Sequence, residues 1–72
     1  MSERPDPLIR KLIARLKDED PLTRRNAAGA LRFHGPRAMA AIPALSKLLT
    51  DDDPRVRSEA RRALQRLRVA AA

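Results

Sequence analysis

Residues 9–21 read IRKLIARLKDEDP, and residues 42–54, thirty-three positions further along the chain, read IPALSKLLTDDDP. Each stretch carries apolar residues at helical spacing and ends in three carboxylates followed by a proline. The match continues beyond the proline, where Arg24, Ala27 and Leu31 correspond to Arg57, Ala60 and Leu64. A period of about 33 residues is typical of units made of two helices, which stack on one another. The sequence therefore predicts a duplicated helix pair.

Four helices are expected, at about residues 8–17, 21–34, 37 or 41 to 49, and 54–68. Apolar residues recur every three or four positions in these segments, and basic residues lie between them. Aspartate followed by proline favours a helix start, because the carboxylate caps free N–H groups and proline suits the first turn. The third helix is expected to bury Ala38, Ile42, Leu45, Leu48 and Leu49. No stretch alternates as a strand would, so the predicted fold class is all-α.

Composition narrows the functions that the chain can perform. Its 72 residues suit one small domain, with a formal charge of +7, no cysteine, one histidine and one aromatic residue. We expect His34 to be a helix-terminal residue rather than a general base. Hydroxyls are few and there is no glycine-rich phosphate loop, so neither an enzyme nor a cofactor is expected. The absence of cysteine fits the cytoplasm, and no apolar run is long enough to place the protein in a membrane.

The two acidic turns, residues 18–20 and 51–53, are the only candidates for a metal site. Each offers adjacent carboxylates, but the calcium-loop spacing, with its central glycine and distal glutamate, is missing. Each turn also lies directly before a proline that starts a helix. We therefore expect no bound metal.

Pro43 early in one helix, Asp51 in the turn, and Val56 and Arg57 one turn into the next helix are landmarks of a known repeat. The second unit resembles a HEAT repeat, of the bacterial phycocyanobilin-lyase-like kind. The resemblance implies an α-solenoid: a right-handed stack of two antiparallel helix pairs. The expected divisions are an N-terminal arm (1–7), a single domain (8–68) with repeats at 8–35 and 36–68, and a C-terminal tail (69–72).

The resemblance also implies a role for the turn residues. In HEAT repeats, the turn aspartate and the following arginine typically bond between neighbouring units. Asp18, Arg24, Asp51 and Arg57 could thus form an inter-repeat ladder. The alternative is purely local: the aspartates cap their own helices, and the arginines are solvated.

By the same resemblance, the helices at 21–34 and 54–68 line the concave inner surface. They hold nine arginines and one carboxylate, Glu59, so this surface should be positive. The expected function is a non-catalytic interaction or scaffold module that binds an acidic or amphipathic protein partner there. The candidate partner-binding residues are Leu22, Arg25, Phe33, Arg55, Arg62 and Arg66.

Three alternatives stay open at this point. Phe33 could instead fold over the core while the arginines only keep the surface hydrated. The same arginine-rich face could bind nucleic acid without reading its sequence, although no recognition motif is present. Finally, two units leave apolar faces at both ends of the stack, so a homo-oligomer could form there.

Overall fold

The computed structural model describes residues 6–71, and all regular structure in this range is helical. The elements in chain order are α1 (Pro7–Arg15), α2 (Pro21–His34), the 3-10 helix η1 (Gly35–Ala41), α3 (Ile42–Lys47), the 3-10 helix η2 (Leu48–Thr50) and α4 (Pro54–Ala71). No strand occurs in the described part of the chain. The predicted all-α class is confirmed.

Three helices begin with the same local device, an aspartate followed by a proline. The pairs are Asp6–Pro7, Asp20–Pro21 and Asp53–Pro54. In each pair the carboxylate accepts a hydrogen bond of 2.8 to 2.9 Å from the backbone N–H two positions later. This satisfies a donor that the first helical turn would otherwise leave free, and it fixes where each helix starts.

The expected third helix is not one continuous α-helix. Residues 35–41 form a 3-10 helix, only six residues form α3, and a further 3-10 turn follows. Pro43 lacks the N–H that would bond back into the preceding segment, and Ala38 has non-helical backbone angles. Leu49 is 38% exposed, so its predicted burial is wrong. Leu49 lines a surface hollow beside α4 with Leu64 and Val69.

The described range includes parts of the expected N-terminal arm and C-terminal tail. Residues 1–5 of the expected arm lie outside the described range, whereas Asp6 caps α1 and Pro7 is its first residue. At the other end α4 continues through Ala71, and Ala72 lies outside the range.

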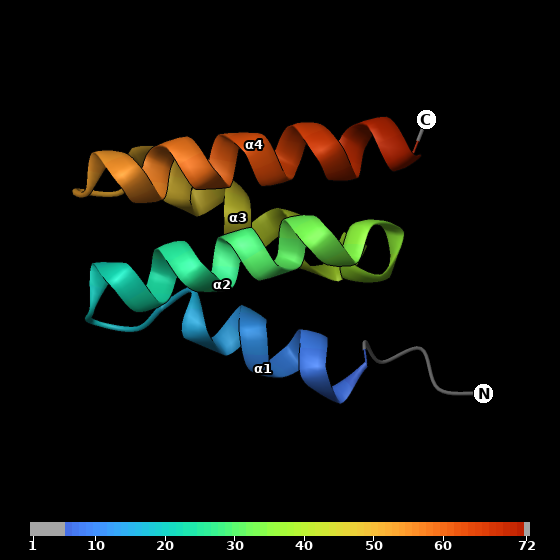
Figure 1. The fold of residues 1–72 in the computed structure, drawn as a ribbon, viewed down its shortest axis with the longest axis horizontal. Helices are drawn as coiled ribbons and strands as arrows, with labels where there is room; N and C mark the ends of the chain where they lie inside the picture. The colour runs from blue at the N-terminus through green and yellow to red at the C-terminus, as the bar shows by residue number, and fades with distance from the viewer. Residues whose placement is uncertain (1–5, 72) are drawn as a thin grey trace.

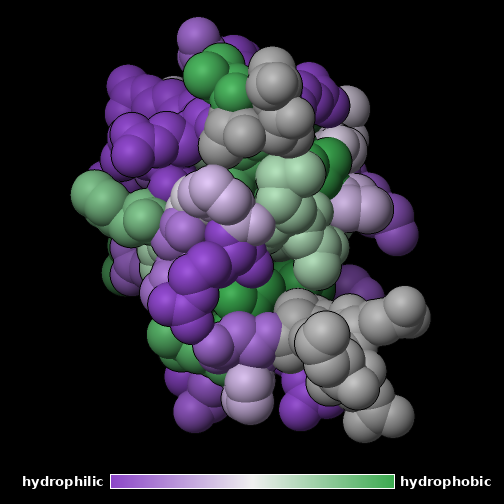
Figure 2. Space-filling model, turned by 90° about the vertical axis from the view of Figure 1, so that its right-hand side faces the viewer, coloured by the Kyte–Doolittle hydropathy of each residue, from purple (hydrophilic) through white to green (hydrophobic). Residues whose placement is uncertain are grey.

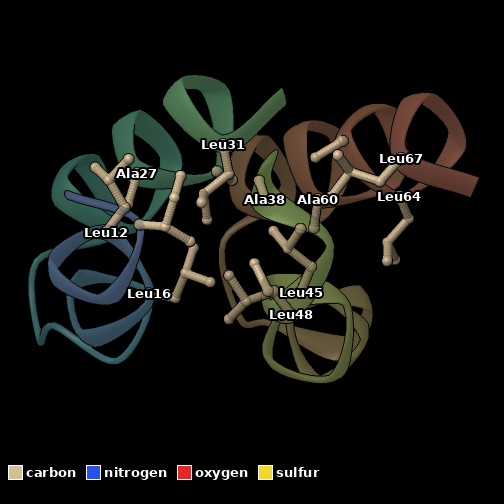
Figure 3. Close-up of a cluster of buried hydrophobic side chains, with 14 of the residues drawn as sticks. Leu12, Leu16, Ala27, Leu31, Ala38, Leu45, Leu48, Ala60, Leu64 and Leu67 are labelled. Atoms are coloured by element: carbon tan, nitrogen blue, oxygen red, sulfur yellow. The ribbon is translucent and has the colours of Figure 1, made fainter. Parts of the chain in front are cut away.

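The helices form two layers. In Figure 1, α1, α2 and α4 follow one another across the molecule, and the chain runs one way along α1 and the other way along α2 and α4. Figure 3 shows α2 and α4 in one layer, and α1 and the segment around α3 in the other. The buried apolar side chains lie between these layers, among them Leu12, Leu16, Leu31, Leu45, Leu48 and Leu64.

Small residues line the contact between α2 and α4. Ala28 in α2 and Ala60 and Ala63 in α4 are buried. Side chains this short let two helix backbones approach closely. The close packing of α2 on α4 places two helices rich in arginine side by side.

Candidate functional site

Surface hollows between α2 and α4 bring arginines from both helices together. The first, of about 280 Å³, is lined by Arg25, Pro54, Arg55, Ser58, Glu59 and Arg62. A second, of about 400 Å³, shares Arg25, Glu59 and Arg62 and adds Arg32 and Phe33. A third, of about 320 Å³, is lined by Arg32, Arg62, Gln65, Arg66 and Val69. We call these three adjoining hollows the arginine groove, after Arg25, Arg32, Arg55, Arg62 and Arg66.

Five of the six predicted partner-binding residues lie along this groove. Arg25, Arg55 and Arg62 line its first hollow, Phe33 its second and Arg66 its third. Leu22, in the first turn of α2, is 48% exposed but lines none of the three hollows. The structure therefore does not bring Leu22 together with the other five.

Phe33 is 81% exposed, more than any other large apolar residue of the described chain. It does not fold over the core, contrary to the first part of the alternative weighed from the sequence. The guanidinium carbon of Arg32 lies 5.2 Å from the centre of its ring, within the range of a cation–π contact. An exposed aromatic ring is thus held beside a positive charge at the edge of the groove.

Sequence reasoning missed an ion pair at the centre of the groove. Arg32 Nε lies 3.1 Å from Glu59 Oε1, and Arg62 Nη1 lies 3.9 Å from Glu59 Oε2. The Glu59 side chain is only 13% exposed. The sequence did offer one indication of a role for Glu59, because it is the only carboxylate among the six arginines of 54–68. Its partner Arg32, on another helix, could not be inferred from spacing.

Gly29 makes room for this carboxylate. A Cβ atom added at Gly29 would lie 3.2 Å from Glu59 Oε1. A side chain at position 29 would therefore press on the ion pair that joins α2 to α4.

The arginines differ in how far their charge is already neutralised. Arg55 Nη2 lies 3.1 Å from Asp53 Oδ2, and this side-chain contact is the main reason that the pKa of Asp53 falls from 3.8 to about 2. Within the part of the chain that the structure describes, Arg25 and Arg66 belong to no ion pair. Arg25 and Arg66 are therefore the groove cations best able to receive an outside anion.

A second polar cluster lies where the acidic turns meet. Arg24 holds Asp51 through two hydrogen bonds, Nε to Oδ2 at 2.9 Å and Nη2 to Oδ1 at 3.0 Å. Its Nη1 also donates to the backbone carbonyls of Asp18 and Glu19. The hydrogen bond from Arg24 is the main cause that lowers the pKa of Asp51. This bidentate contact joins α2 to the turn before α4.

The other two candidate ladder residues make only local contacts among residues 6–71. Arg57 Nη1 donates to the carbonyls of Asp51 (2.6 Å) and Asp52 (3.2 Å). Asp18 Oδ1 accepts the backbone N–H of Asp20 at 2.8 Å. The structure thus brings Arg24 and Asp51 together but leaves Asp18 and Arg57 apart.

Among the described residues, no three His, Cys, Asp or Glu side chains come close enough to hold a metal ion. None of the described helices combines the length and the apolar character that crossing a membrane requires.

Comparison with known proteins gives one match. The family model described as HEAT repeats matches residues 9–72. This confirms the resemblance to HEAT repeats, but it does not distinguish the phycocyanobilin-lyase-like kind. Searches of curated proteins and of solved structures gave no match.

Proposed function

Because the chain belongs to the HEAT repeat family, whose members commonly act as protein-interaction modules and are generally non-catalytic, we propose that it binds a protein partner in the arginine groove. The partner is an acidic or amphipathic segment. The observation that carries this proposal is the exposed ring of Phe33 in a groove where two arginines, Arg25 and Arg66, have no carboxylate partner among the described residues.

The architecture that we propose is two stacked units, residues 8–35 and 36–68, each an antiparallel helix pair. In this arrangement α2 and α4 are the second helices of their units and line the inner face of a right-handed stack. Their parallel course in Figure 1 supports this arrangement. The Arg24–Asp51 contact then becomes a rung between units, the first of a ladder that Asp18 and Arg57 would extend.

The proposed binding mode divides the groove into two parts. An apolar side chain of the partner packs on Phe33, where an exposed ring offers a large contact area. Carboxylates of the partner meet Arg25, Arg62 and Arg66, whose guanidinium groups suit bidentate contacts. Arg55 contributes less, because its guanidinium is already bonded to Asp53.

A synthetic helical peptide tests this mode, with glutamates on one face and leucines on the other. We expect saturable binding by fluorescence anisotropy at low salt. Phe33→Ala should weaken it by about thirtyfold, as expected for an aromatic hot spot. Arg62→Gln should weaken it by about five- to tenfold, because a charged contact is lost.

Arg10→Gln on α1 is the matched control, because it removes one charge from a helix outside the groove. The proposal fails if this control weakens binding as much as Arg62→Gln does, or if the unmodified protein does not bind the peptide.

Nucleic acid is the second candidate, favoured by the five arginines that line the groove. A row of cations can follow phosphates without base contacts, and such binding falls steeply with salt. Electrophoretic mobility shifts of random duplex DNA at several salt concentrations distinguish the two candidates. DNA binding that survives physiological salt and is lost in Arg62→Gln would favour nucleic acid. If DNA causes no mobility shift even at low salt, the protein partner stays the favoured candidate.

The ends of the stack are a second surface, on which we propose that another copy of the chain can dock. Leu49, Leu64 and Val69 line a hollow of about 370 Å³ beside α4. In Figure 2, which looks along the helices, apolar atoms emerge between hydrophilic side chains, and the two ends of the proposed stack lie at the top and bottom of the view. Sedimentation over a range of protein concentrations separates a monomer from a dimer.

A further inference from the structure

The contact between the two units has two sides, one from each unit. Residues equivalent to each side also lie at one outer end of the molecule. Adding 33 to a residue number converts a position in the first unit to its equivalent in the second. Residues of α2 that face α4 thus have equivalents on the outer side of α4. Residues of α4 that face α2 have equivalents on the outer side of α2. The internal contact is therefore a template for how another unit would pack at either end.

The polar residues of the internal contact, Arg24 and Asp51, have equivalents with similar local hydrogen bonds at the two ends, Arg57 and Asp18. Arg24 uses Nη1 for two turn carbonyls, and its Nε and Nη2 for Asp51. Arg57 uses Nη1 in the same way, and its Nε and Nη2 have no partner among residues 6–71. Asp18 accepts the N–H two residues later, as Asp51 does. Arg57 and Asp18 are therefore the two halves of a second Arg24–Asp51 contact.

The apolar halves follow the same correspondence. A hollow of about 510 Å³ beside α1 and α2 is lined in part by Leu12, Ala27 and Ala30. Their equivalents in the second unit, Leu45, Ala60 and Ala63, are all fully buried. At the opposite end, Leu49 and Leu64 line the hollow beside α4. Their equivalents, Leu16 and Leu31, are buried.

Two arginines interrupt this match. Arg61 lines the hollow beside α4 at the position equivalent to Ala28, which is fully buried. Arg15 lines the hollow beside α1 and α2 at the position equivalent to Leu48, which is 8% exposed. In a continued stack both guanidinium groups would enter an apolar contact without a carboxylate. Burial of an unpaired charge outweighs the gain from one partly exposed ion pair.

We propose that a second copy of this chain docks head to tail, with Arg57 of one copy holding Asp18 of the next, and that Arg15 and Arg61 keep this association weak. The inference rests on the two-unit stack and the self-association proposed above, and it does not depend on the arginine groove. If Arg15 and Arg61 weaken the docking in this way, the unmodified protein should be monomeric at micromolar concentration.

Sedimentation velocity of the 72-residue chain tests the role of the two arginines. The double variant Arg15→Leu, Arg61→Ala should associate at least about a hundredfold more tightly than the unmodified protein. The control Arg10→Leu, Arg66→Ala makes the same change in charge and in side-chain types at positions that line neither end hollow. Equal association of the double variant and this control would overturn the proposal, as would tight association of the unmodified protein.

Variants of the rung test the register. In the double-variant background, either Asp18→Asn or Arg57→Met should weaken association about tenfold or more. Asparagine at 18 keeps an oxygen that can accept the N–H of Asp20, so Asp18→Asn answers the question even if Arg57→Met unfolds. A mixture of the two variants should associate more tightly than either alone, because one supplies Arg57 and the other Asp18. No effect of Asp18→Asn would show that the copies meet in another register.

Peptide binding in the groove, measured on the same double variant, keeps the two proposals apart. Arg15 and Arg61 line no part of the groove, so affinity for the peptide should be unchanged. Unchanged peptide binding without self-association would refute only the docking of copies. Self-association without peptide binding would refute only the groove.

Discussion

Arg24 and Arg57 occupy equivalent positions, and only Arg24 holds a carboxylate from the other half of the molecule. Arg24→Met removes these bonds and leaves Asp51, whose side chain is 8% exposed, without its main partner. We expect a loss of about 2 kcal/mol in the free energy of unfolding. Arg57→Met removes only bonds to backbone carbonyls and should cost about 1 kcal/mol or less. Urea unfolding of both variants measures the difference.

The comparison separates the two interpretations of the turn residues. A larger loss for Arg24→Met assigns stability to the contact between α2 and the turn before α4. Equal losses would show that each arginine acts only on its own turn, and that the Arg24–Asp51 pair adds nothing measurable.

The turn carboxylates make stability depend on pH at the acid end of the scale. The pKa of Asp51 is lowered chiefly by the hydrogen bond from Arg24, and that of Asp53 is lowered to about 2 chiefly by Arg55. A carboxyl with a lower pKa in the folded state stabilises the fold above its unfolded value of about 3.9. This contribution is lost as pH falls from about 4 towards 2, where both states become protonated.

Urea unfolding at a series of pH values checks this dependence. The free energy of unfolding should fall between about pH 5 and pH 2. Arg24→Met should show a shallower fall, because the main cause of the lowered pKa of Asp51 is gone. An equally steep fall in Arg24→Met would contradict the assignment of the Asp51 pKa to Arg24.

At the scale of the elements, the end of α2 depends on a glycine. Gly35 has a φ of +59°, which L side chains rarely adopt, and a Cβ added there would meet no atom within 4 Å. Gly35→Ala should therefore cost about 1 to 2 kcal/mol from backbone strain alone. Thermal unfolding followed by circular dichroism measures the loss.

Gly29→Ala, in the interior of α2, is the matched control. Alanine favours the helix interior by about 1 kcal/mol over glycine, while its Cβ would press on Glu59. The two effects oppose each other, so the net change should be smaller than that of Gly35→Ala. A loss at Gly29 as large as that at Gly35 would show that Glu59 cannot move.

Much of the element structure could be predicted, because it is local. The Asp–Pro pairs mark helix starts, and apolar residues at helical spacing in 54–68 are the ones buried in α4: Val56, Ala60, Ala63, Leu64 and Leu67. The third segment could not be predicted in detail. Its apolar spacing suits a helix, yet Pro36 and Pro43 each remove a donor, and 3-10 turns replace much of the α-helix. The spacing that predicted burial of Leu49 also could not show that this residue lines a surface hollow beside α4.

The candidate site shows the same division between local and long-range information. The stripe Arg55, Glu59, Arg62 and Arg66 follows from steps of three and four residues along one helix. The pairing of Glu59 with Arg32 depends on how α2 lies against α4, which spacing within either helix does not specify. Spacing also could not place Leu22. It lies about three helical turns before Phe33 on α2, yet it lines none of the three hollows.

At the scale of the whole molecule, the nine arginines of residues 21–34 and 54–68 lie on three surfaces. Arg24 and Arg57 face the acidic turns, and Arg61 and Arg68 line the hollow beside α4. The other five line the groove. Net charge alone would treat them as one basic face, whereas the structure places them on separate surfaces.

The most direct test of the groove is a titration of the isotope-labelled protein with the acidic amphipathic peptide, followed by backbone amide NMR. We predict saturable shift changes in α2 and α4 around Arg25, Phe33, Arg62 and Arg66, with α1 and α3 little affected. Changes centred on α1, α3 or the two end hollows, or no saturable change at low salt, would contradict the proposal that this groove is the binding surface.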